Sequence, residues 1–177
     1  MKSNMTTKDL TTIGVCIAIA VVLGKVLGIL HSVIPFTRGI INAPFYSFLI
    51  AVMLYRIRKP GTMIMFALGY GLTMSYISIF MSMAVIIGGI IGELIMLVVT
   101  RKYHSNFIIA LCAPIYSVGG IIGTFFVVTF VVNSPRYIFE GYFALLISVI
   151  SVYIAGLFGS FTAMKIMPIK LRNISNA

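Results

Sequence analysis

Long apolar runs separated by short polar clusters make up almost the whole chain. The densest cluster, Arg56-Ile57-Arg58-Lys59, lies between two such runs and is followed by Pro60-Gly61. A basic cluster that ends in a helix-breaking pair is typical of a short turn between two membrane spans. The pattern predicts six helices, at about Leu10–Leu30, Ile41–Tyr55, Thr62–Ile79, Met83–Thr100, Phe107–Val132 and Gly141–Met164.

The third and fourth helices come from one apolar segment of 40 residues, 61–100, in which Glu93 is the only charged residue. Because one membrane span needs about 20 residues, this segment is long enough for two spans. We therefore expect a tight apolar turn near 78–82.

Composition agrees with this pattern. Of the 177 residues, 60% are hydrophobic and only 9% are charged, whereas about a quarter of the residues in a soluble domain are charged. The sequence therefore predicts an all-α integral membrane protein that forms a single transmembrane domain, 1–177, with no room for a soluble domain.

The net charge of +10 does not indicate a nucleic-acid partner, because the cations cluster at the ends of apolar runs, where they set topology and attract anionic lipid. With six spans and both termini inside the cell, only Arg38 and Arg136 lie outside and Lys25 lies within the membrane. The remaining ten cations lie inside: Lys2, Lys8, Arg56, Arg58, Lys59, Arg101, Lys102, Lys165, Lys170 and Arg172.

Small residues four positions apart allow close approach of helix backbones in a membrane. Gly14 and Ala18 form such a pair on the first helix, on a face that is a candidate for docking a partner protein. Further pairs, which we expect to pack inside the bundle, are Gly88 with Gly92, Gly119 with Gly123, and Gly156 with Ser160.

Two ionisable residues, Lys25 and Glu93, fall inside predicted spans. A charge there costs roughly 2.5–3.5 kcal/mol on insertion scales, so it normally faces a partner or a wet cavity. They are candidates either for an ion pair with each other or for binding a ligand.

Other polar residues cluster near the predicted outer ends of the helices. Asn42, Asn133, Arg136 and Glu140 are candidates to line an outward-facing pocket, although Arg136 and Glu140 also have the spacing of a local ion pair. The candidates for stacking on an aromatic ring are Tyr46, Tyr70, Tyr76 and Tyr116.

Motifs for chemistry are missing from the sequence. It has no P-loop, nucleophile motif or carboxylate pair, and His31 and His104 are predicted on opposite sides of the membrane. We therefore expect no enzyme activity, no catalytic residues, no metal and no cofactor.

The opening of the first helix, Lys8-Asp9-Leu10-Thr11-Thr12-Ile13-Gly14-Val15-Cys16-Ile17-Ala18, resembles that of the substrate-binding S components of energy-coupling factor (ECF) type ABC vitamin transporters. In that family an Ala-xxx-Ala pair docks on a coupling subunit; here Gly14 takes the place of the first alanine. Asn42 to Tyr46, Arg56 to Gly61 and the Gly92-Glu93 helix are similar to the group for thiamine or hydroxymethylpyrimidine, and the resemblance covers most of 8–120.

The resemblance implies a six-helix S-component bundle in the bacterial cell membrane. It would bind a small water-soluble vitamin or precursor, with hydroxymethylpyrimidine favoured because thiamine binders tend to use tryptophan and this chain has none. The partners would be a coupling transmembrane subunit and two ATPase subunits. The alternatives left open are a different S-component subfamily, a self-contained homo-oligomeric carrier or channel, and a scaffold that binds no ligand.

Overall fold

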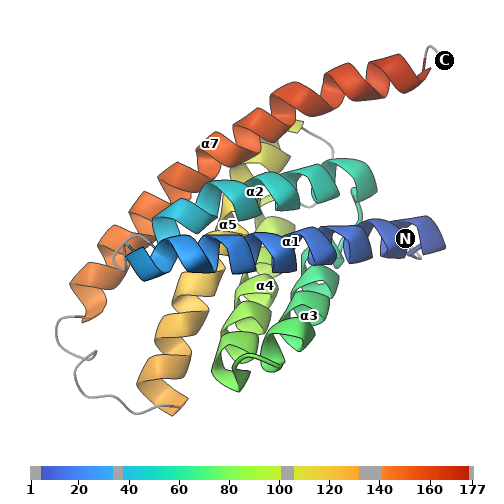
Figure 1. Ribbon diagram of the computed structural model, residues 1–177. Coiled ribbons are helices and arrows are strands. Elements are labelled where there is room, and N and C mark those ends of the chain that lie inside the picture. Colours follow the sequence, from blue (N-terminus) through green and yellow to red (C-terminus); the bar gives the residue numbers. More distant parts are fainter. Residues whose placement is uncertain (1–4, 34–37, 101–105, 132–140, 176–177) are drawn as a thin grey trace.

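The structure is a computed structural model that describes residues 5–33, 38–100, 106–131 and 141–175. Within these ranges the chain is helical and contains no strand (Figure 1). The helices are α1 (Thr7–Val33), α2 (Arg38–Ile57), α3 (Thr62–Ser75), α4 (Ile79–Thr100), α5 (Asn106–Phe126), the π-helical turn η2 (Val127–Val131) that continues α5, and α7 (Gly141–Ser175).

The six α-helices correspond to the six predicted from the sequence, with two differences at their ends. The turn between α3 and α4 comes earlier than expected, since α3 ends at Ser75 and α4 begins at Ile79. The last helix continues to Ser175 instead of ending near Met164, because lysine and arginine end an apolar run but are themselves good helix formers.

Five of the described helices are long and apolar enough to cross a membrane: α1, α2, α4, α7 and α5 together with η2. The sixth, α3, has 14 residues. At 1.5 Å per residue it is about 21 Å long, which is shorter than a hydrocarbon core of about 30 Å. The fold is therefore that of a helical membrane protein with five spanning-length helices, and α3 is shorter than the sequence predicted.

Contacts between elements that are distant in the sequence bring several helix ends together. Lys59 Nζ lies 2.6 Å from the Asp9 carboxylate, so the start of α1 meets the α2–α3 turn. The Tyr55 hydroxyl donates a hydrogen bond of 2.8 Å to the Asn106 carbonyl, which joins the end of α2 to the start of α5. We call this end of the bundle, which holds the Arg56–Lys59 turn, the basic end.

Helices α3, α4 and α5 lie side by side, and α1 crosses over them beside α2 (Figure 1). Helix α2 packs against α5 and α7 as well as α1. Between the helices, nearer the basic end, lies a core of fully buried large side chains, among them Ile50, Met53, Met63, Phe66 and Ile109.

Glycines allow the closest helix packing, as the small-residue pairs predicted. A Cβ atom on Gly119 would lie 2.5 Å from the Gly88 carbonyl oxygen, and one on Gly123 would lie 2.5 Å from the Ala84 carbonyl oxygen. A Cβ on Gly156 would lie 2.6 Å from the Ser47 hydroxyl. These helices pack backbone to backbone, which fixes the positions of the α4 and α5 residues described next.

Candidate functional site

A cavity of about 830 Å³ lies between the helices at the end opposite the basic end. Its size falls within the range of small-molecule sites, roughly 300–1,000 Å³. Apart from Tyr116, which is the middle residue of α5, each described lining residue comes from the half of its helix that lies away from the basic end, or from the α3–α4 turn. They are Gly24, Lys25, Gly39, Asn42, Ala43, Tyr46, Tyr70, Met74, Ile77, Met81, Val85, Tyr116, Ser117, Gly120, Ile121, Thr124, Phe125, Val128, Leu145 and Ser148.

Three tyrosines form the part of the cavity nearest the core. The hydroxyls of Tyr46 and Tyr70 lie 2.7 Å apart, and Tyr46 also donates a long hydrogen bond of 3.4 Å to the Ala20 carbonyl. Phe66 stacks on Tyr70 with ring centroids 5.8 Å apart and meets Tyr116 edge to face at 5.5 Å. This packing holds the rings in place, so the cavity presents a preformed aromatic surface.

Glycine at position 24 leaves room for this arrangement. A Cβ atom there would lie 3.0 Å from the Tyr46 hydroxyl and 3.1 Å from the Tyr70 hydroxyl. A side chain at position 24 would therefore push against both hydroxyls, which now lie close to the backbone of α1.

Two buried polar atoms in the cavity lining have no hydrogen-bond partner among the described residues: the Asn42 side-chain carbonyl oxygen and the Tyr116 hydroxyl. Buried polar atoms are nearly always paired with protein, water or ligand. A nearby link of 3.3 Å between the Ser47 and Ser117 hydroxyls shows the usual pairing on the same two helices. Both residues line the cavity, but these two atoms are themselves buried in its wall.

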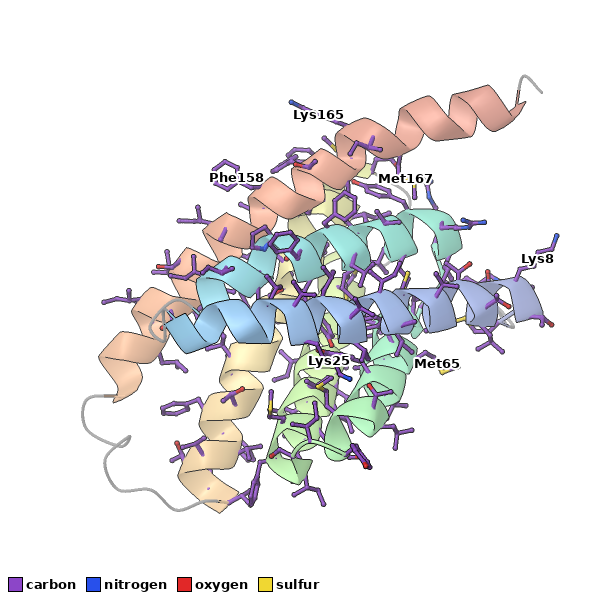
Figure 2. The ribbon with its side chains drawn as sticks, viewed as in Figure 1. Lys8, Lys25, Met65, Phe158, Lys165 and Met167 are labelled. Atoms are coloured by element: carbon purple, nitrogen blue, oxygen red, sulfur yellow. The ribbon has the colours of Figure 1, made fainter. Side chains whose placement is uncertain are left out.

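Lys25 lines the cavity from α1. Figure 2 shows its side chain pointing from α1 toward α3 and α4, whereas Lys8 and Lys165 point away from the helices. No hydrogen bond or ion pair joins Lys25 to another described residue.

The structure places Glu93 away from the cavity, which differs from the expectation that it contacts a ligand. Its carboxylate accepts hydrogen bonds from the backbone N–H groups of Gly61, at 2.6 Å, and Met63, at 2.9 Å. These are the first N–H groups of α3, which have no partner within the helix, and an anion is favoured at that position. Only 1% of Glu93 is exposed, so it ties α4 to the α2–α3 turn.

For the same reason, the expected alternative of an ion pair between Glu93 and Lys25 is wrong. The two side chains lie at opposite ends of the bundle, and Lys25 has no partner among the described residues. The carboxylate is instead held at the basic end by backbone donors.

Of the other residues expected in the pocket, the structure brings together Lys25, Asn42, Tyr46 and Tyr116. Tyr76, a candidate for stacking, is 97% exposed and does not line the cavity. Asn133, Arg136 and Glu140 lie outside the described residues.

The face of α5 that supplies much of the cavity lining was not predicted from the sequence. Ser117, Gly120, Ile121, Thr124 and Val128 follow the spacing of one helix face. The signal that would have found it is the pair of hydroxyl residues seven positions apart, Ser117 and Thr124, in an otherwise apolar helix.

The candidate docking residues on α1 are open. Gly14 and Ala18 are exposed, and nothing lies within 4 Å of a Cβ built on Gly14. The neighbouring side chains on this face are also exposed and apolar: Val15, Ile19, Val22 and Val26.

No family model, curated protein or solved structure matches this chain. No group of three or more His, Cys, Asp or Glu side chains that could hold a metal occurs in the described ranges. The function must therefore be argued from the cavity and the α1 face.

Proposed function

We propose that this protein is a substrate-binding membrane subunit that captures a small water-soluble molecule in the cavity and delivers it with an ATPase-driven partner module. The observation that carries the proposal is the position of the cavity, at the end of the bundle opposite the basic end. If the basic end is cytoplasmic, as the positive-inside rule requires, the cavity faces the outside of the cell.

This topology gives six crossings with both termini inside, in which α3 crosses with fewer residues than the other helices. Its first N–H groups bind Glu93 at the basic end, while Tyr70 and Met74, near its last turn, line the cavity. The short helix thus connects the two ends, in support of six crossings.

The partner module would be a coupling transmembrane subunit with two ATPase subunits, as the resemblance to S components implies. The exposed α1 face around Gly14 and Ala18 is the proposed contact, because small exposed residues let a second helix approach closely. A pyrimidine such as hydroxymethylpyrimidine is the first ligand to test, since the three tyrosines offer a surface on which a flat ring can stack.

Two glycines allow the binding and docking roles to be separated. Gly14 and Gly120 are both helical, and nothing lies within 4 Å of a Cβ built on either one. Gly120 lines the cavity, whereas Gly14 lies on the exposed α1 face. Leucine at position 120 would fill cavity space, and leucine at position 14 would block close approach of a partner helix.

The experiment is a mild-detergent pull-down of the tagged protein from its native membranes, combined with a thermal-shift binding assay on yeast-extract small molecules. We expect wild type to retain two P-loop ATPases and a larger membrane subunit. Gly120→Leu should keep these partners and lose the ligand-induced shift, and Gly14→Leu should do the reverse. Recovery of copies of this chain alone, under several detergents, would instead support a self-contained homo-oligomeric carrier or channel.

A further inference from the structure

The cavity has one charged group among its described lining residues, and that group is a cation, Lys25. The rest of the described lining is apolar or neutral. A ligand in this cavity therefore meets a positive charge that is not neutralised by any described protein group.

Neither acid in the described part of the chain lies at the cavity. The whole sequence has three acidic residues. Asp9 pairs with Lys59, and Glu93 binds the start of α3, both at the basic end. The third, Glu140, lies outside the described residues, so no described acid is available to attract a cation into the cavity.

The position of Lys25 separates it from an ordinary lipid-facing residue. Its exposed neighbours on α1, such as Val22 and Val26, are apolar. Lys25 instead points toward α3 and α4 (Figure 2) and lines the cavity with Tyr70 and Met81. An ionisable residue inside a membrane span that faces a cavity is by default a ligand or ion contact.

We propose that the ligand is a small anion, with a carboxylate or phosphate group that binds the Lys25 ammonium. This inference rests on the proposed function, because it specifies the substrate class of the same cavity. The flat or apolar remainder of the molecule contacts the tyrosines that line the cavity. A cationic vitamin such as thiamine is disfavoured, since its charge would face the ammonium, and a pyrimidine ligand is expected as a phosphate or carboxylate derivative rather than as the neutral hydroxymethylpyrimidine.

The charge of the ligand can be tested before its identity is known. Ultrafiltered yeast extract is separated by ion exchange at pH 7 into anionic, neutral and cationic pools. Each pool is titrated against the protein in lipid nanodiscs, and thermal unfolding is followed with a fluorogenic maleimide. That dye reads out unfolding because Cys16 and Cys112 are buried free thiols.

The variants are Lys25→Met, Lys25→Arg and the matched control Lys165→Met, which removes the same charge from an exposed residue outside the cavity. We expect the anionic pool to raise the unfolding midpoint of wild type, Lys165→Met and Lys25→Arg. For Lys25→Met the amount of this pool needed for half the shift should rise at least about tenfold, because the anion loses the opposite charge that it binds. If Lys25→Met does not fold, Lys25→Gln takes its place.

Three results would count against the inference. Stabilisation by the cationic or neutral pool alone, or an equal response of Lys25→Met to the anionic pool, would overturn the anion assignment and leave the proposed function standing. If no pool stabilises wild type, the cavity does not bind a small molecule, and both proposals fail.

Discussion

Glu93→Gln distinguishes a structural from a ligand-binding role for the buried acid. Both carboxylate oxygens accept a backbone N–H, from Gly61 and from Met63. Glutamine has nearly the same shape, but its NH₂ group cannot accept a hydrogen bond, so one N–H at the start of α3 loses its partner. The negative charge at the helix N-terminus is lost as well.

The magnitude follows from these two losses. A hydrogen bond to a charged group contributes about 1.5–3 kcal/mol, and a charge at a helix N-terminus contributes about 0.3–1 kcal/mol. The free energy of unfolding should therefore fall by about 2–4 kcal/mol. For a chain of this length, 1 kcal/mol lowers the unfolding midpoint by about 2–4 °C, so a fall of at least roughly 4 °C is expected.

The assay is the maleimide unfolding scan at a fixed heating rate, with and without the stabilising pool. The control is Ser160→Ala, because Ser160 is also fully buried but its hydroxyl bonds only to Leu157 in the same helix. Glu93→Gln should have the lower midpoint of the two and keep the ligand-induced shift. An unchanged midpoint with the shift abolished would refute the structural role and return Glu93 to the binding site.

Two further predictions concern the packing of α4 against α5 and the hydrogen-bonded tyrosine pair in the cavity. Gly119→Ala should destabilise the protein by about 1–3 kcal/mol, because its Cβ would meet the Gly88 carbonyl. The control Gly120→Ala has open space around its Cβ and should be neutral or up to about 1 kcal/mol stabilising. Equal unfolding midpoints for the two variants would contradict the described α4–α5 contact. Tyr46→Phe removes the 2.7 Å hydroxyl contact with Tyr70. It should lower the free energy of unfolding by about 1 kcal/mol and weaken ligand binding in the same scan. A variant with the unfolding midpoint and the ligand-induced shift of wild type would show that the tyrosine pair has no part in the site.

The sequence predicted the helices well because charge and helix breakers mark their ends. Arg56 to Gly61 and the basic cluster after Thr100 divide the apolar runs clearly, and the 61–100 segment is too long for one span. The start of α4 was misplaced by four residues, since the turn before it, 76–78, contains no glycine, proline or charge.

Some residues of the candidate site were predicted correctly from the sequence and Glu93 was not, and the physical reason is different in each case. Asn42 and Tyr46 lie early in α2, and Lys25 lies late in α1, so an alternating topology alone brings them to the same end. Glu93 lies near the middle of the predicted helix Met83–Thr100, where sequence spacing does not show which end its carboxylate reaches. The N–H groups of Gly61 and Met63 that bind it belong to the backbone, and every residue but proline has one, so no side-chain pattern could have identified these two contacts.

The tyrosine floor of the cavity has a consequence for how a solute could leave. Between Tyr116 and the basic end the described interior is filled with side chains such as Phe66, Met63 and Ile109, each 0% exposed. To open a water-filled route through them would expose several large apolar groups, at about 1.5–3 kcal/mol each. The described interior therefore has no continuous open route from the cavity to the basic end. A solute bound in the cavity would cross only if this packing opened or the whole bundle moved in the membrane, which under the proposed function is the task of the ATPase-driven partner.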